Sequence, residues 1–259
     1  MLKLIEWAKG KQFWLGGLVL AFVVGTSALV NGGPPTTESP FQFEVTLAET
    51  AAEGIAELGL DVPVTGRVFV IITKDGGSEP REQIDVTGVP FWGKDMHALE
   101  EGESIILEGK DPTVVGYPLE RLDDIPPGLY YVQAFANVYT TFERSDGHVV
   151  EMHLNSGAGQ NLWRAPGNAH SRVMRVYLDP EESGTVSLAL TEVIPPIEGQ
   201  NEGESLQQGN PRDTDWVKYV KIQSELVSEF WGRPMYIGAN VLLPQGYEEN
   251  PEVDYPVIY

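Results

Sequence analysis

The 259-residue sequence predicts a mainly β-sheet protein with three parts: an apolar N-terminal helix, a β-sandwich and the first strands of a second domain. Three observations predict this order. A basic and then apolar segment opens the chain, alternating apolar residues recur through its middle, and a polar stretch rich in Pro and Gly precedes the last apolar strands. The predicted boundaries are 1–30 for the helix, 31–40 for a linker, 41–195 for the sandwich, 196–215 for a second linker and 216–259 for the last strands.

The first thirty residues have the three-part form of an export signal. Lys3, Lys9 and Lys11 precede an uncharged apolar run, Phe13 to Val30, which ends in small residues around Ala28. A signal peptide would be cleaved after Ala28, whereas the same run is also long enough to remain as a membrane anchor or tether. Both alternatives predict an extracytoplasmic protein, periplasmic or secreted, because the positive charges precede the apolar run.

Composition excludes several classes of protein. The chain has 38 acidic and 17 basic side chains, a net charge of −21, and such a surface repels phosphate backbones. We therefore expect no nucleic-acid partner. It contains no cysteine, which excludes a disulfide framework, a cysteine nucleophile and thiolate metal sites.

The first half of the sandwich is predicted from local apolar patterns. Residues 41–47 alternate as a strand, and 50–60 have a helical spacing that two glycines interrupt, which predicts a short helical insertion. Gly66 to Thr73 is apolar on both faces and predicts a central strand. Pro90 to Gly93 is interpreted as an interruption between strands. Weaker strands are expected near Ser104–Leu107, Thr113–Tyr117, Met174–Leu178 and Val186–Val193.

The longest predicted strand runs from Leu129 to Phe142, after a turn formed by Pro126, Pro127 and Gly128. This entry is typical of immunoglobulin-like sandwiches, in which a tyrosine near the corner bonds back to the backbone. Tyr130 is the candidate for that role, with an ordinary core position as the alternative. A hairpin turn at 145–147 then returns the chain along Val149–Leu154.

A long loop, Asn155 to Ser171, carries Trp163 and Arg164. Loops of this length are uncommon unless they bind or cover something.

The last segment predicts more strands. Met235 to Leu243 alternates as a strand with one buried face, Val217 to Phe230 is interpreted as a second extended run, and Trp231 to Pro234 joins them as a turn. Tyr255 to Tyr259 is interpreted as a third apolar strand.

Residues 221–226, 236–247 and 255–259 resemble the entrance to the catalytic domain in the enterochelin-esterase-like branch of the α/β hydrolases. Shorter similarities to the front domains of large exported members occur at 138–142, 145–148 and 165–168. The resemblance implies a serine-hydrolase parent, truncated here before its catalytic residues. The chain would then be the non-catalytic N-terminal portion of an exported esterase, and the missing C-terminal catalytic domain would be its partner, which it orients or whose cleft it shapes.

The sequence lacks the motif that a catalytic centre of this kind requires. The nucleophile elbow of such enzymes requires Gly-x-Ser-x-Gly, and the sequence has no such pentapeptide. We expect no catalytic or cofactor-binding residue. The alternative function is a self-contained binding module for polysaccharide or another envelope component, with 216–259 as its closing strands. Its sugar-stacking candidates are Trp92, Tyr131, Tyr139 and Trp163, although aromatic residues at such positions are more often core or linker-packing residues.

The histidines and the clusters of carboxylates are the candidates for a metal or acid–base site. The histidines are His97, His148, His153 and His170; His148 and His153, five apart around one strand, are predicted on opposite faces and so not to share a metal. Around the same hairpin, the carboxylates of Glu143, Asp146 and Glu151 could form an acid and base pair or a solvated tip. The acidic pairs at 123–124 and 181–182 lack the alternating spacing of a calcium loop. We expect no metal site.

Overall fold

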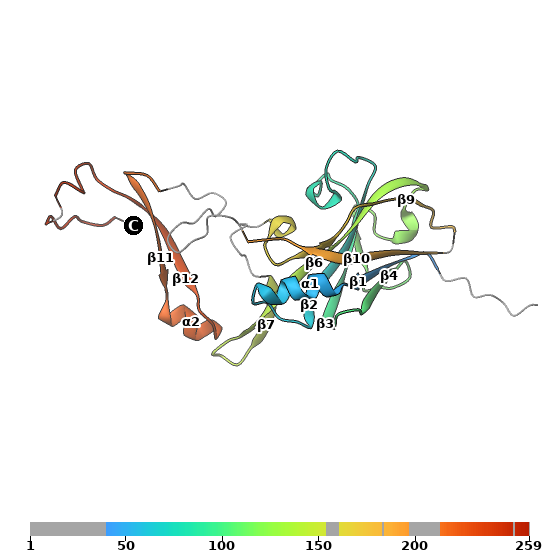
Figure 1. The fold of residues 1–259 in the computed structure, drawn as a ribbon, viewed down its shortest axis with the longest axis horizontal. Helices are drawn as coiled ribbons and strands as arrows, with labels where there is room; N and C mark the ends of the chain where they lie inside the picture. Colours follow the sequence, from blue (N-terminus) through green and yellow to red (C-terminus); the bar gives the residue numbers. More distant parts are fainter. Residues whose placement is uncertain (1–39, 154–160, 183, 197–212, 251, 259) are drawn as a thin grey trace, which may run out of the picture. The chain divides into compact units, whose positions relative to one another are not determined.

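The computed structural model describes residues 40–153, 161–182, 184–196, 213–250 and 252–258 (Figure 1). The predicted signal or anchor lies outside these ranges, as do most of both predicted linkers and part of the 155–171 loop. Within the described ranges, the two α-helices are α1 (Glu49–Glu57) and α2 (Glu225–Trp231), and neither approaches the length needed to cross a bilayer.

The described chain is mainly β-strand, as the sequence predicts. Ten strands share one sheet: β1 (Gln42–Leu47), β2 (Val64–Thr73), β3 (Phe91–Leu99), β4 (Ser104–Glu108), β5 (Val115–Tyr117), β6 (Gly128–Glu143), β7 (Val149–His153), β8 (Ala169–Ser171), β9 (Met174–Leu178) and β10 (Thr185–Val193). Two more, β11 (Val217–Gln223) and β12 (Tyr236–Leu242), form a separate two-stranded ribbon. Single turns of 3-10 helix lie at η1 (Pro80–Glu82), η2 (Leu122–Asp124) and η3 (Leu162–Arg164).

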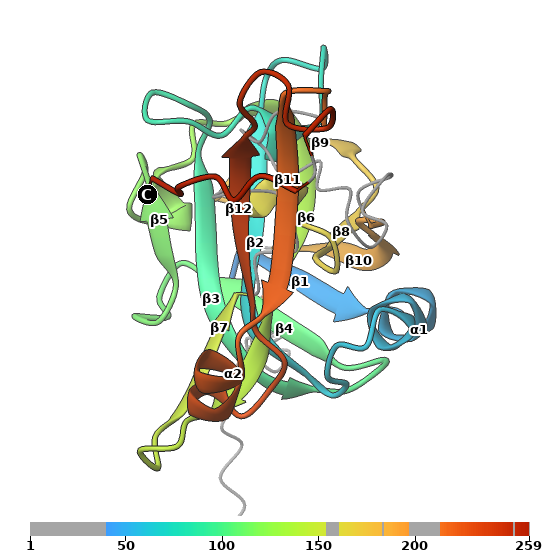
Figure 2. The same cartoon turned by 90° about the vertical axis from the view of Figure 1, so that its left-hand side faces the viewer.

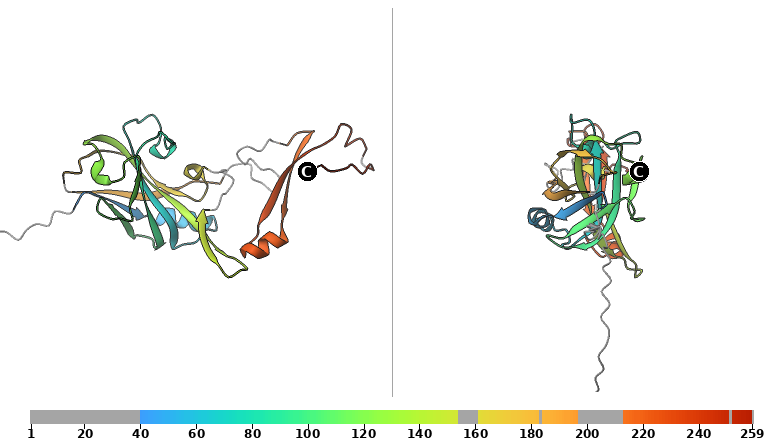
Figure 3. Two further views of the ribbon diagram at one scale, coloured as in Figure 1. Left: turned by 180° about the vertical axis from the view of Figure 1, so that it is seen from behind. Right: turned by 90° about the vertical axis from the view of Figure 1, so that its right-hand side faces the viewer.

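The large sheet follows one path, β4-β1-β10-β8-β6-β2-β3-β5, with β7 and β9 also paired to β6. β1 and β10 are parallel, and the other pairs in the path are antiparallel. The sheet curls, so that strands near its two ends meet: the Nζ atom of Lys94 in β3 donates to the carbonyl oxygen of Ile106 in β4 at 2.9 Å. Figure 2 and Figure 3 show this curvature from further sides.

The core lies between the facing halves of the curled sheet. β1 buries every second side chain, Phe43, Val45 and Leu47, as its alternation predicts. These pack in the same cluster as apolar residues of β2, β6 and β10. α1 adds Ala51 and Ile55 from its buried face, which confirms the predicted helical insertion. The central position of β2, between β3 and β6, is confirmed too.

The predicted interruption at Pro90 to Gly93 is wrong, because Phe91 opens the nine-residue strand β3. Its burial does not alternate: Trp92 and Gly93 are both buried. Gly93 allows a close approach from β2, since a Cβ atom there would lie 2.7 Å from Nε of Arg67. Trp92 and Gly93 lie on opposite faces of the strand, and both faces are covered here, so burial does not alternate. The register shift between β2 and β3 lies at the other end of the pair, between Val64 and Gly66.

Two predictions for the last segment are also wrong. The extended run that starts at Val217 ends at Gln223, because Ser224 caps α2 by accepting a hydrogen bond from the amide of Val227 at 3.3 Å. Gly232 ends that helix with a φ of +67°, which glycine adopts without strain. The expected third strand is not found in the described residues 255–258.

The role expected of Tyr130 is observed. Its hydroxyl donates to the carbonyl oxygen of Pro126 at 2.8 Å, while its ring is 5% exposed and belongs to the core. One side chain thus fixes the corner that leads into β6 and also packs beneath it.

Candidate functional site

Residues 161–168 of the predicted long loop cover one face of the sheet. The prediction of a loop is wrong for Ala169–Ser171, which form β8 within the sheet because they pair with β6 and β10. η3 places the Trp163 ring against Phe69, Phe91 and Phe135, with centroids 5.2, 5.9 and 4.9 Å away. The guanidinium of Arg81 donates to the Trp163 carbonyl oxygen at 2.6 Å. The loop is therefore a packed cover, held by the Trp163 ring and by the hydrogen bond to the Trp163 carbonyl oxygen.

The four aromatic residues considered for sugar stacking do not form one surface. Trp92 is fully buried in the core. Tyr131 and Tyr139 lie eight residues apart on β6, about 27 Å along a strand. The Trp163 ring packs against the three phenylalanines beneath it. The alternative interpretation as packing residues holds for the two tryptophans.

A buried polar network adjoins this cover. Gln133 is 1% exposed. Its side-chain Nε2 donates to Oε2 of Glu79 and to the carbonyl oxygen of Ser171, both at 3.1 Å. Burial alone would raise the pKa of Glu79, but hydrogen bonds from Gln133 and Arg81 outweigh it and lower that pKa. The Nδ1 atom of His170 lies 3.2 Å from the same Ser171 oxygen. The sequence pattern did not point to Gln133, which orders this network.

The four histidines lie in different surroundings. His97 and His148 are exposed, His170 is buried in β8, and His153 is half-buried in β7, where burial lowers its pKa. Within the described ranges, no three His, Cys, Asp or Glu side chains gather closely enough to hold a metal ion.

The acidic clusters lie in different surroundings. Slight burial tends to raise the pKa of Asp146, but hydrogen bonds from His148 and the charge of Arg144 lower it. Across the hairpin, Glu143 is paired with Val149 and Glu151 with Thr141. At the pair 123–124, Arg121 binds the Asp123 carboxylate at 2.8 Å and donates its backbone amide to Asp124 at 3.2 Å. The pair at 181–182 is exposed to solvent.

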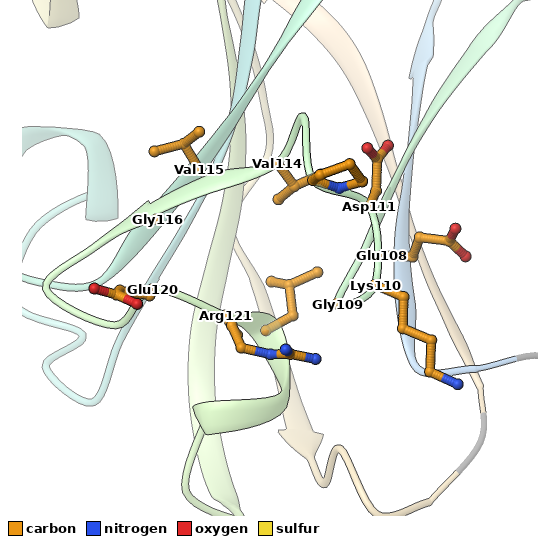
Figure 4. A pocket seen from close by; sticks show the side chains of 11 residues that line it. Glu108, Gly109, Lys110, Asp111, Val114, Val115, Gly116, Glu120 and Arg121 are labelled. Atoms are coloured by element: carbon orange, nitrogen blue, oxygen red, sulfur yellow. The ribbon is translucent and has the colours of Figure 1, made fainter.

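An open cleft of about 500 Å³ lies between residues 108 and 122 (Figure 4). Its charged lining residues are Glu108, Lys110, Asp111, Glu120 and Arg121. Lys94 pairs with Asp111 at 2.7 Å, and hydrogen bonds from Lys94 and Thr113 lower the pKa of Asp111 to about 2. Three acidic and two basic side chains line the cleft, and this nearly balanced charge does not favour a phosphate or a metal ion.

The ribbon presents the most distinctive surface. In its register Val220 opposes Ala239, Ile222 opposes Ile237 and Lys218 opposes Val241, so that these side chains share one face. This apolar face is predicted to be buried, yet Val220, Ile222, Ile237 and Val241 are 43, 58, 51 and 37% exposed. The prediction is wrong for the described chain, in which no element covers the face.

On the opposite face of the ribbon, side chains contact other residues of the ribbon. The ring of Tyr219 lies over Gly238, where a Cβ atom would be 2.3 Å from its hydroxyl oxygen. The ammonium of Lys221 lies 4.7 Å from the centre of the Tyr236 ring. Both faces are exposed to solvent, but this one carries contacts between its own aromatic and polar side chains, whereas no such contact lies on the aliphatic face of the described ribbon apart from its strand pairing.

α2, which connects the ribbon strands, contacts the β6–β7 hairpin. The amide of Ser145 donates to the carbonyl oxygen of Phe230 at 2.9 Å. Trp231 packs edge-on against Phe142 at 5.5 Å between ring centres, and the guanidinium of Arg144 lies 4.8 Å above the Phe230 ring. The helix is thus engaged by the sheet domain, whereas the apolar face of the ribbon is not.

Comparison with known proteins found no family model, no curated protein and no solved structure that matches this chain. Among the described surfaces, the bare apolar face of β11–β12 carries the most information.

Proposed function

We propose that residues 41–195 form an immunoglobulin-like accessory domain of an exported, extracytoplasmic serine esterase, and that β11–β12 belongs to its α/β-hydrolase domain. The observation that carries this proposal is the bare apolar face of the ribbon. The large sheet already has a complete core of its own. The ribbon contributes none of the buried core residues, although its sequence alternates like that of a strand covered on one side.

The free energy of burying apolar side chains favours another layer packed against this face. An isolated two-stranded ribbon is at best marginally stable in water, and it normally requires further strands or a packed layer. Burying one aliphatic side chain stabilises by roughly 1.5 to 3 kcal/mol. Four such side chains on one face therefore favour packing against another sheet or helix. In the resembling enzymes that layer is the catalytic domain, which supplies the nucleophile, acid and histidine.

The corner at Tyr130 supports the immunoglobulin-like part of the proposal. Its hydrogen bond to Pro126 spans four residues at the start of a long strand, as in the tyrosine corner of such sandwiches. The accessory domain would orient the catalytic domain through the contact between α2 and the β6–β7 hairpin. It would supply no catalytic group itself.

The first experiment measures ester hydrolysis. The purified 259-residue chain is expected to show no turnover of p-nitrophenyl acetate, while the product of the gene read beyond the codon for Tyr259 is expected to hydrolyse it. Turnover by the 259-residue chain, or a reading frame that ends without a Gly-x-Ser-x-Gly motif, would contradict the proposal.

A matched pair of variants in the longer product tests the face itself. Ile222→Lys places a charge on the apolar face and is expected to lower activity by about tenfold or more, since a buried unpaired charge costs several kcal/mol. Gln223→Lys adds the same charge to the opposite face and is expected to leave activity within about twofold. Equal effects of the two variants would show that the bare face is not the contact surface.

A further inference from the structure

The large sheet splits at one place, between β9 and β10. β8 lies between β6 and β10 and pairs with both. After Ser171 the chain continues into β9, which pairs with β6 from Gly128↔Leu178 to Val132↔Met174. Within the described ranges, β10 has no partner on this side before Leu190. Figures 1 and 2 show β9 apart from β10.

Backbone direction identifies the groups on the unpaired edge. The carbonyl oxygens of Gly184 and Leu190 accept hydrogen bonds from the β1 side, from Gln42 at 3.0 Å and Ala48 at 3.1 Å. Successive residues of a strand direct their N–H and C=O groups to alternate edges. Residues 185, 187 and 189 therefore direct both groups away from β1 and into the split.

A groove of about 670 Å³ occupies the split. Residues 171–174 line one side, and residues 187–189 with 191–192 line the other. Val173 and Met174 are each 39% exposed beside it. The groove thus combines a row of backbone donors and acceptors with the apolar side chains of Val173 and Met174, a combination that recognises an added strand. Arg172 and Glu192, which also line it, pair with each other at 3.2 Å.

This edge lacks the protection found at the ends of the sheet. Exposed edges are normally shortened or blocked by charges and proline. At one end, β5 has only three residues; at the other, Lys94 occupies the Ile106 carbonyl of β4. By contrast, the β10 stretch Thr185 to Ala189 contains neither a charge nor a proline.

We propose that the groove between β9 and β10 binds an extended peptide segment of another protein, which pairs with residues 185–189 as an additional strand. The peptide would continue the antiparallel pairing that β8 makes with β10. A peptide fits because its alternating N–H and C=O groups match those of residues 185, 187 and 189. This inference is independent of the proposed esterase parentage, which concerns the ribbon.

The experiment uses the whole 259-residue chain and a nine-residue peptide of alternating Thr and Val, flanked by Lys for solubility. Amide exchange is followed residue by residue by NMR. On peptide addition, the amides of 185, 187 and 189 are expected to exchange at least about tenfold more slowly, whereas those of 186 and 188, already bonded to β1, do not change. Absence of protection at millimolar peptide would overturn the proposal.

Two controls separate strand pairing from other binding. Ala189→Pro removes one donor at the unpaired edge and is expected to weaken binding about tenfold, whereas Ala189→Thr keeps the donor and stays within about twofold. A peptide with N-methyl groups along one edge tests the same point on the unchanged protein. Equal binding of methylated and unmethylated peptides would overturn the proposal, as would concentration-dependent protection of these amides without peptide, which indicates pairing of two copies.

Discussion

The Nζ atom of Lys94 lies 2.7 Å from Oδ2 of Asp111 and 2.9 Å from the carbonyl oxygen of Ile106, so that one ammonium joins β3 to β4 and to the loop after it. The two charged side chains are only 26 and 17% exposed. The pKa of Asp111 falls from its ordinary 3.8 to about 2 because Lys94 and Thr113 donate hydrogen bonds to its carboxylate. A lowered pKa stabilises the native state above pH 4, and this contribution is lost as the pH falls toward 2.

Asp111→Asn is expected to flatten this part of the pH profile. Urea unfolding between pH 4 and pH 2 should show a smaller loss of stability than in the original protein. At pH 7 the variant should be less stable by about 1 to 3 kcal/mol, since the Lys94 charge loses its partner. Asp95→Asn is the control: its carboxylate is 59% exposed and should change stability by less than about 1 kcal/mol. Parallel pH profiles for Asp111→Asn and the original protein would contradict the prediction.

Tyr130→Phe should lower the free energy of unfolding by about 1 kcal/mol, because it removes the hydrogen bond to Pro126 and keeps the buried ring. Thermal unfolding at neutral pH measures this change. Tyr177→Phe, at a tyrosine that is 60% exposed, should have no measurable effect. If the two variants behave alike, the corner hydrogen bond does not stabilise the domain.

Trp163→Ala should destabilise the protein by about 2 to 3 kcal/mol, because the indole fills the space above Phe69, Phe91 and Phe135. Hydrogen exchange should also become faster in residues 161–171. Trp216→Ala, at a tryptophan that is 51% exposed, provides the comparison and should cost less than about 1 kcal/mol. Unchanged exchange in the loop would mean that Trp163 does not hold the cover in place.

Gly66→Ala should be among the most damaging small substitutions. A Cβ atom there would lie 2.1 Å from the carbonyl oxygen of Asn137, and backbone in a paired strand cannot easily move. We expect a loss of about 2 to 3 kcal/mol in urea unfolding. At Gly184 a Cβ atom meets nothing within 4 Å, so Gly184→Ala should change stability by less than about 1 kcal/mol.

The half-buried His153 should make stability depend on pH near neutrality. Burial lowers its pKa below 6.5, so the unfolded chain takes up a proton first as the pH falls. Stability should therefore decrease from about pH 7.5 down to the pKa of the folded state. His153→Phe should reduce this slope in urea unfolding, and His97→Gln, at an exposed position, should not. A slope that persists in His153→Phe would assign the effect to another group.

Local patterns made the individual elements predictable. Alternation predicted β1 and the long β6, and a pair of apolar faces predicted the central β2. The turn before Tyr130 predicted a hydrogen bond that the structure contains. Each of these signals depends on residues that are neighbours in sequence. α2 was also predictable in principle, because Ser224 followed by Glu225 is a helix-start signal.

Relations between distant segments were not predictable in this way. The split between β9 and β10 depends on which strand β9 joins, and the alternation of Met174 to Leu178 is the same for either partner. The burial of both Trp92 and Gly93, on opposite faces of β3, depends on what covers each face of the sheet, which the pattern of one strand does not contain. The contacts of Gln133 join three segments whose order in space is set only by the curled sheet.

The parallel pairing of β1 with β10 has a consequence for biosynthesis. Gln42 and Thr185, which form part of this pair, are separated by 143 positions. A ribosome must therefore synthesise nearly the whole domain before its first strand can acquire this neighbour. Until then β4 is the only sheet neighbour of β1 that has been made, and a chain that stops short of β10 leaves the other edge of β1 open to pairing with another molecule.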